Sequence, residues 1–272
     1  MPLKYPVLLA HGMGFRDDRL IGYWGRIPKM LTEQGERVYF SRQDSNGSIE
    51  GNSRQMVKSL AAALSDSGAE KVNIIAHSKG GLEARYLISS LGCHDRVASL
   101  TTLSTPHDGS STVDALMKRL RPVIRFGCRA ADIYFRLLGD ISPDTYSAVC
   151  AFETENARRF NCENPDSPDV YYQSYAFAMG SGLSDITMVI PWLAVNGVEG
   201  ENDGLLSPES VMRGEFRGVC RGRGRRGISH CDEVDMRRHG FPVALTGDKS
   251  CEFNDITELY SKITRDLMEK GF

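Results

Sequence analysis

The first 103 residues alternate between short apolar runs and segments whose apolar side chains recur every three or four positions. The short runs predict strands at 6–10, 38–40, 71–76 and 97–103. The helical spacing predicts helices at 23–34, 53–65 and 79–91. Strands and helices in alternation are typical of a parallel sheet covered by helices on both faces. The carboxyl ends of such strands share one edge of the sheet, where proteins of this class bind their ligands.

The chain changes character after residue 110, where the apolar positions predict several short helices. Three breakers interrupt them, namely Pro122, Gly139 and Pro143. Later elements are predicted as strands at 170–177 and 191–195 and a terminal helix at 255–270. We therefore expect one α/β domain over residues 1–272, with a helical lid or cap inserted at about 111–165.

One stretch is rich in arginine and glycine. Between Arg213 and Arg226 it holds six arginines and four glycines against a single acid, Glu215. This composition predicts a solvated loop. The alternative is a segment that attracts anionic head groups or released fatty acid by its local charge.

Composition narrows the function classes. The 272 residues carry 33 basic and 35 acidic side chains, and a net charge of −2 gives no general reason to expect a nucleic-acid partner. The longest apolar run, 188–195, is much shorter than the roughly 20 residues of a membrane-spanning helix. Because only a few apolar residues precede His11, we expect a cytoplasmic chain or the mature form of a secreted one. The seven cysteines form no C-x-x-C pair, which argues against a zinc ribbon and leaves open one disulfide through Cys220 or Cys231.

A strand–turn–helix motif marks the candidate nucleophile. The predicted strand 71–76 runs into the sequence AHSKGG, with Ser78 at its centre. This is the context that a nucleophile elbow of the G-x-S-x-G type requires, with Ala76 as the small residue in first position. Such a turn lifts the Ser78 oxygen above the sheet and points helix N–H groups toward it. A helix cap is the alternative role for this serine.

Acyl transfer also needs N–H donors for the oxygen of the tetrahedral intermediate. One is expected at Lys79, directly after the serine, and the other in the loop after the first strand. Gly12 lets that loop turn so that the Met13 N–H can face Ser78. A simple glycine turn is the alternative for this loop.

The chain order serine, acid, histidine narrows the choice of the catalytic base. The six histidines are His11, His77, His94, His107, His230 and His239. Those before Ser78 or close behind it leave no room for an intervening acid. We therefore predict His230 as the base, with His239 in reserve, and a structural role for His107.

The acid is predicted in the Asn-Asp-Gly sequence at 202–204, which follows the apolar run 191–195. Asp203 would fix the tautomer of His230 and stabilise its protonated form. An exposed aspartate in a β-turn is the alternative, and Asp185 is the rival acid.

Four motifs, in this order along nearly the whole chain, resemble those of the bacterial triacylglycerol lipases of the α/β-hydrolase fold. They are YPVLLAHGMGF at 5–15, AHSKGGL at 76–82, LSTPHDGS at 103–110 and NDG at 202–204. The resemblance implies a catalytic triad of Ser78, Asp203 and His230, with the N–H groups of Met13 and Lys79 as oxyanion donors. It also implies that the insertion contains a lid over the acyl pocket.

The resemblance implies no cofactor for the reaction, although many such lipases hold a structural calcium ion. One ligand there is a carboxylate two residues after the catalytic histidine, which is Asp232 in this chain. The other ligands of that pattern do not align, because Met236 stands where a side-chain oxygen is needed. Calcium takes six or more oxygen ligands. The Asp/His cluster of the related zinc-containing subgroup has no counterpart in the sequence.

These residues together predict a serine-dependent carboxylic-ester hydrolase that cleaves acylglycerols or similar fatty-acyl esters through an acyl-enzyme. Phospholipase, thioesterase and acyltransferase activities share this machinery and are alternatives, as is a non-catalytic lipid-binding homologue. The expected partner is a fatty-acyl lipid, with transient contact at a lipid interface. The insertion is either a mobile lid that opens on lipid or a fixed helical cap.

Overall fold

Six parallel strands form the centre of the molecule. The computed structural model describes residues 2–17, 22–222, 225–238 and 253–272. The strands pair in the order β2-β1-β3-β4-β5-β6, with every pairing parallel. Their bounds are β1 Val7–Ala10, β2 Val38–Phe40, β3 Val72–His77, β4 Val97–Leu103, β5 Tyr171–Phe177 and β6 Glu215–Cys220. The predicted strands up to residue 103 and the one at 170–177 are confirmed.

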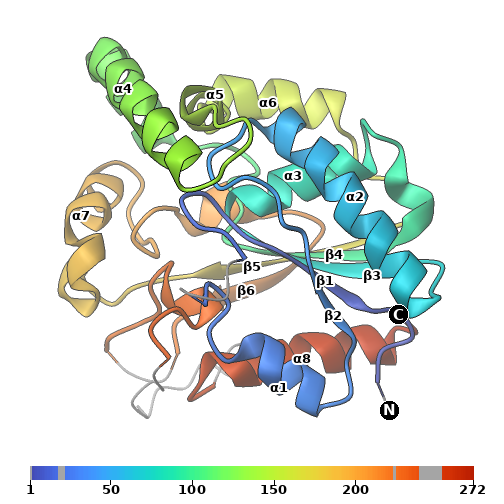
Figure 1. The fold of residues 1–272 in the computed structure, drawn as a ribbon. Coiled ribbons are helices and arrows are strands. Elements are labelled where there is room, and N and C mark those ends of the chain that lie inside the picture. The colour runs from blue at the N-terminus through green and yellow to red at the C-terminus, as the bar shows by residue number, and fades with distance from the viewer. Residues whose placement is uncertain (1, 18–21, 223–224, 239–252) are drawn as a thin grey trace.

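Helices cover both faces of this sheet, as the alternation predicts (Figure 1). One face carries α2 (Ile49–Ser67) and α3 (Lys79–Ile88), and the other carries α1 (Ile27–Glu33) and α8 (Ile256–Glu269). Two apolar cores result, one on each side. The central strands β1, β3 and β4 are buried along their whole length, which explains why they read as continuous apolar runs.

Three helices lie between β4 and β5, where the insertion is predicted. They are α4 (Ser111–Leu137), α5 (Thr145–Cys150) and α6 (Thr154–Glu163). The expected break at Pro122 is wrong, because α4 is one helix of 27 residues with this proline inside it. A proline deprives the carbonyl four residues earlier of its partner. Here that residue, Lys118, is exposed to solvent, so water can hydrate the carbonyl.

The strand predicted at 191–195 is also wrong. This run lies in a helix, α7 (Val189–Val198). Periodicity cannot separate a short, wholly apolar run in a strand from one in a helix. Pro191 fits the first turn of α7, where the backbone N–H groups need no partner within the helix.

The arginine-rich stretch is not a loop as a whole, because it contains the edge strand β6. Arg217 lies in that strand and pairs with Glu215 and with Asp266 of α8. Its other described arginines include Arg213, paired with Asp166, and Arg221, paired with Glu201. Neighbouring acids thus neutralise much of the charge that favoured a contact with anionic lipid.

Five short 3₁₀ helices complete the described elements. They are Cys93–Arg96, Gly182–Ser184, Ile186–Met188, Pro208–Val211 and Asp232–Val234. The last of these begins two residues after His230. Among the described residues, no helix has the length and apolar character needed to cross a membrane.

Candidate active site

Ser78 lies at the sharp turn between β3 and α3. Its backbone angles are φ 54° and ψ −131°, in a region that L-residues rarely occupy. The turn is possible because small residues let the helix approach β1: a Cβ on Gly80 would lie 2.5 Å from the His11 carbonyl oxygen. Observed strain of this kind is a feature of functional sites.

The loop after β1 packs directly on this turn. A Cβ on Gly12 would lie 2.8 Å from the Cβ of Ser78, so only glycine fits there. The N–H of Gly12 donates to the Tyr23 hydroxyl, and that of Gly14 to the side chain of Asn46. In the described part of the chain, no acceptor takes the N–H of Met13 or of Lys79. These two backbone groups are therefore available to a ligand beside Ser78.

Asp203 and His230, 27 residues apart, meet in a hydrogen bond. The imidazole Nδ1 of His230 lies 2.8 Å from Oδ2 of Asp203, and the backbone N–H of His230 donates to the Asp203 carbonyl. The other carboxylate oxygen accepts the N–H groups of Leu205 and Leu206, both at 2.8 Å. Burial opposes ionisation of Asp203. His230 and these hydrogen bonds outweigh it, however, and lower the pKa of the carboxyl well below its usual range.

The imidazole of His230 also lies at the Ser78 turn. Its ring centre is 4.3 Å from that of His77, the residue before the serine. The rival acid Asp185 instead pairs with Arg237. His107 is buried and hydrogen-bonds to Arg85 and Thr102. His239 lies outside the described residues.

Glu233 is a member of this site that the sequence analysis does not single out. The carboxyl group is fully buried; it accepts a hydrogen bond from Ser104 Oγ at 3.0 Å and shares another with His77 Nε2 at 3.1 Å. Burial, and next the charge of Asp203, raise the pKa of Glu233 well above its usual range. A hydrogen bond between the Glu233 and Asp203 carboxyl groups contributes to this rise in pKa, which favours the neutral form of Glu233. The one available signal was its place three residues after His230, in the same short helical turn.

Both ring nitrogens of His77 are hydrogen-bonded. Nδ1 lies 2.5 Å from the Tyr23 hydroxyl, which also accepts the N–H of Gly12, and Nε2 lies 3.1 Å from the Glu233 carboxyl. One ring nitrogen of a neutral imidazole donates and the other accepts. Burial, and after it the neighbouring His230, lower the pKa of His77 well below its usual range and keep this ring neutral. We call Tyr23, His77, Asp203, His230 and Glu233 the buried polar cluster.

A protein-family model described as palmitoyl protein thioesterase matches residues 6–158, from β1 to the middle of α6. The chain belongs to this family. The matched range includes the loop after β1 and the Ser78 turn, but it ends before Asp203 and His230.

The curated relatives that this chain matches are named lipases. The chain is 29% identical to triacylglycerol lipase 2 of Saccharomyces cerevisiae, over 93% of this chain and 75% of the yeast protein. It is 28% identical to a triacylglycerol lipase of Vibrio cholerae, over 98% and 89% of the two chains. The lipase of Staphylococcus hyicus superposes with a TM-score of 0.72 at 18% identity, over 98% and 96%. The predicted α/β-hydrolase fold and the resemblance to bacterial lipases are confirmed.

Asp232 does not fit a calcium site. Its Oδ2 accepts hydrogen bonds from the Arg226 guanidinium at 2.6 Å and from the Ser229 N–H at 3.1 Å. Met236, at a position where the calcium pattern needs an oxygen, packs against the apolar core. Because calcium requires six or more oxygens, and a guanidinium already neutralises this carboxylate, the donor set does not suit the ion.

One other group of ligand-type atoms converges within 4.8 Å in the described residues. It comprises His77, His230 and Glu233. His77 and Glu233 are hydrogen-bonded to each other, and His230 is hydrogen-bonded to Asp203, so each of these groups already has a partner. We therefore assign the group to the buried polar cluster and not to a metal.

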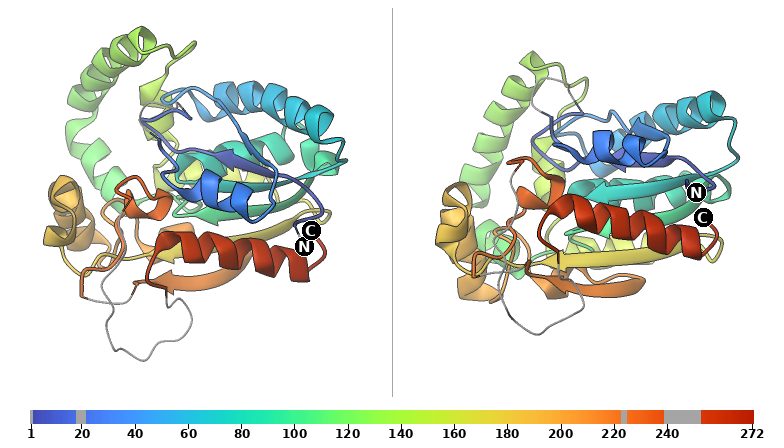
Figure 2. Two further views of the ribbon diagram at one scale, coloured as in Figure 1. Left: turned by 60° about the horizontal axis from the view of Figure 1, so that its bottom comes forward. Right: turned by 90° about the horizontal axis from the view of Figure 1, so that it is seen from below.

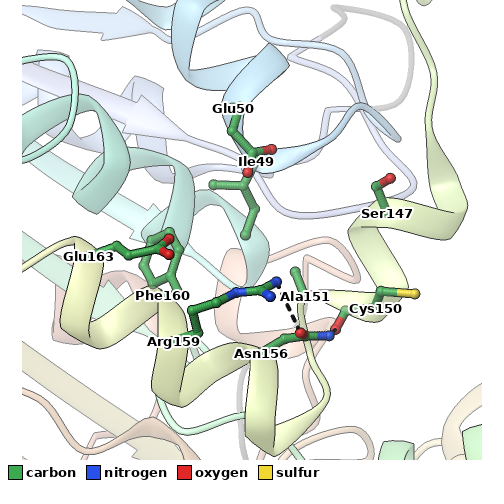
Figure 3. A pocket seen from close by; sticks show the side chains of 9 residues that line it. All are labelled: Ile49, Glu50, Ser147, Cys150, Ala151, Asn156, Arg159, Phe160 and Glu163. Carbon is green, nitrogen blue, oxygen red and sulfur yellow. Dashed lines mark hydrogen bonds between the residues drawn. The ribbon is translucent and has the colours of Figure 1, made fainter.

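A pocket of about 270 Å³ lies apart from Ser78, where α5 and α6 face the start of α2 (Figure 3). Its lining carries three charged side chains, Glu50, Arg159 and Glu163, and Arg159 hydrogen-bonds to Asn156. None of the predicted site residues lines it. The pocket is too polar to accept a fatty-acyl chain readily.

Apolar side chains are exposed along α4 and around α7. Both helices follow from the carboxyl ends of strands, α4 after β4 and α7 after β5, and they contact each other (Figure 2). The side chain of Phe126 is 76% exposed and that of Ile190 is 81% exposed. Further exposed members are Leu116, Leu120, Val123, Ile133, Leu137, Leu183, Ile186 and Leu193. We call these side chains the apolar rim.

Proposed function

We propose that this protein hydrolyses fatty-acyl esters through an acyl-enzyme on Ser78. The observation that carries the proposal is the convergence of the strained Ser78 turn with the Asp203–His230 hydrogen bond. The named lipase relatives support an oxygen ester as the substrate. The apolar rim supports a substrate with a long acyl chain.

In the first half of the reaction, Ser78 Oγ attacks the ester carbonyl and its proton passes to Nε2 of His230. Asp203 holds Nδ1–H of that ring and stabilises the imidazolium that forms. The N–H groups of Met13 and Lys79 stabilise the negative oxygen of the tetrahedral intermediate. His230 then gives its proton to the leaving alcohol, which departs as the acyl-enzyme forms.

In the second half, water attacks the acyl-enzyme while His230 removes a proton from it. Collapse of this second intermediate returns the proton to Ser78 Oγ and releases the fatty acid. The buried polar cluster keeps Asp203 ionised and next to His230 throughout, because neutral Glu233 donates to it and adds no second charge.

The direct test replaces Ser78 by alanine and measures hydrolysis of p-nitrophenyl esters from acetate to palmitate. We expect a loss of kcat of at least about 10⁴-fold. Ser65→Ala, at an exposed position on α2, is the matched control and should retain full activity. Labelling of the wild type by an organophosphonate should map to Ser78. Full activity in the Ser78→Ala variant would falsify the proposal.

The family match favours thioesters as a second candidate substrate, since the model carries the description palmitoyl protein thioesterase. The same serine chemistry cleaves a thioester, with a thiol as the leaving group. Comparing kcat/KM for p-nitrophenyl palmitate and for an S-palmitoylated peptide separates the two. A higher value for the peptide would make the thioester the main substrate.

The apolar rim is the part we propose to contact the lipid surface, and α4 acts in it as a fixed cap. Both ends of α4 are anchored: Glu199 accepts from the N–H of Thr112, and Asp140 accepts from the N–H of Asn46. With its apolar side chains already exposed, α4 need not open. The rate on a short-chain triglyceride should therefore rise smoothly through the solubility limit. A sudden jump there would instead indicate a mobile lid.

A further inference from the structure

Two buried aspartates flank the loop that carries His230. Asp185 comes from the start of a 3₁₀ turn, 45 residues before the histidine, and Asp232 follows it by two residues. Both are joined to Ser229, the residue directly before His230: its hydroxyl donates to Asp185 at 2.8 Å and its N–H donates to Asp232 at 3.1 Å. Both carboxylates therefore hold the residue next to the base.

Each of these carboxylates has its own arginine. Arg237 reaches both oxygens of Asp185, with its Nη2 at 2.7 Å from each, and it also donates to the Thr187 hydroxyl. Arg226 donates to Asp232 at 2.6 Å. Both acids are at most 4% exposed, so neither charge could remain there without a cationic partner.

We propose that Arg226 and Arg237 are positioning residues that hold the His230 loop in place of a metal ion. This inference rests on the proposed function of His230. Among the residues that the structure describes, two guanidinium groups balance these two carboxylates, which weakens their attraction for a divalent cation. The planar fork of Arg237 also fixes the direction of the Asp185 carboxylate, which a single ammonium group cannot do.

The first experiment uses the wild-type protein and p-nitrophenyl butyrate. Activity and melting temperature should be the same, within error, after dialysis against EDTA and after addition of about 5 mM CaCl₂. This concentration exceeds the dissociation constants of weak extracellular calcium sites, which are about 10⁻⁴–10⁻³ M. Loss of activity in EDTA that calcium restores would overturn the proposal.

The second experiment removes the guanidinium. Arg237→Ala should lower kcat about 10-fold or more at unchanged KM, because the imidazole is misplaced while acyl binding is untouched. Methylguanidinium in solution should restore part of kcat. Arg237→Lys keeps the positive charge but lacks the planar fork of the guanidinium, so its kcat should lie between those of the wild type and Arg237→Ala. Arg221→Ala, which removes an exposed pair with Glu201, is the matched control. Wild-type kcat in folded Arg237→Ala would contradict the inference.

The two proposals fail in different ways. If Ser78 is not the nucleophile, the organophosphonate will not label it in any variant. If labelling and wild-type hydrolysis are normal but EDTA inactivates the protein, or the guanidinium is dispensable, only the arginine proposal fails. If the Arg237→Ala variant does not fold, the Arg237→Lys variant and the EDTA experiment still decide it.

Discussion

The buried polar cluster and the apolar rim are built on opposite principles. In the cluster every side chain is polar, buried and hydrogen-bonded, and the residues come from the end of β3 and from loops and a 3₁₀ helix far apart in the chain. In the rim the side chains are apolar and exposed, on helices that leave the body of the molecule. Exposed apolar area contributes little to folding, whereas buried polar groups are costly when left unpaired. Substitutions in the cluster should therefore change the rate and the stability, and those in the rim the handling of lipid.

The largest effect is expected for the acid of the cluster. Asp203→Asn should reduce kcat by about 10³- to 10⁴-fold, because an amide no longer imposes the productive tautomer on His230. Hydrolysis of p-nitrophenyl butyrate by the purified variant measures it. Asp169→Asn, at an exposed turn position, serves as the control. A loss of less than about ten-fold would show that Asp203 does not act on the base.

A smaller effect on kcat is expected for Glu233. The difference between its Gln and Ala variants reports whether the carboxyl group is neutral. Glu233→Gln preserves a neutral group that can hydrogen-bond to both Asp203 and His77, so activity should stay within a few-fold of wild type. Glu233→Ala leaves those partners unpaired and should lose about 10- to 100-fold in kcat and about 1–3 kcal/mol of stability. Equal losses in both variants would argue for a charged Glu233.

The rim should respond only when the substrate is aggregated. Replacing Phe126 and Ile190 together by serine should lower the rate on emulsified tributyrin several-fold and leave hydrolysis of dissolved p-nitrophenyl acetate unchanged. The free energy of unfolding should change by less than about 0.5 kcal/mol per site, since both side chains are exposed. Met212→Ser is the control outside the rim. An equal loss on both substrates would place these side chains in the chemistry instead.

The smallest effect concerns pH. The pKa of Asp203 is lower in the folded protein than in the unfolded chain, so the interactions of the ionised carboxylate stabilise the fold above about pH 4. That contribution is lost as the pH falls below this value toward the folded-state pKa. The difference in melting temperature between wild type and Asp203→Asn should therefore be constant near neutrality and shrink on acidification. A difference that grows on acidification would contradict this assignment.

The regular parts of the fold are readable from the sequence because local pattern and burial agree there. The predicted bounds of β4 at 97–103 match the observed strand, and its apolar residues are buried on both faces. The helices on the two faces were predicted from their spacing for the same reason. Ser78 was predicted from its place between such elements, and Asp203 and His230 from chain order; the structure joins the last two by a hydrogen bond.

Some features of the site could not be predicted because they depend on contacts between residues far apart in the chain. Glu233 looks like an ordinary acid, and only the packing of His77 and Asp203 against it shows that it is buried and neutral. The role proposed for Arg237 likewise depends on its pairing with Asp185, 52 residues earlier, which the sequence does not reveal. The helix α7 was mistaken for a strand because its exposed apolar residues lack the polar face that marks a surface helix.

The strand β6 was missed because arginine and glycine do not resemble the interior of a sheet. It lies at the sheet's edge, where its outer N–H and C=O groups could template pairing with another molecule. Charged side chains on an edge strand oppose such intermolecular pairing, and Arg217 also forms an ion pair with Asp266 of α8. The composition that disguises this strand thus helps keep separate copies of the protein from joining into larger sheets.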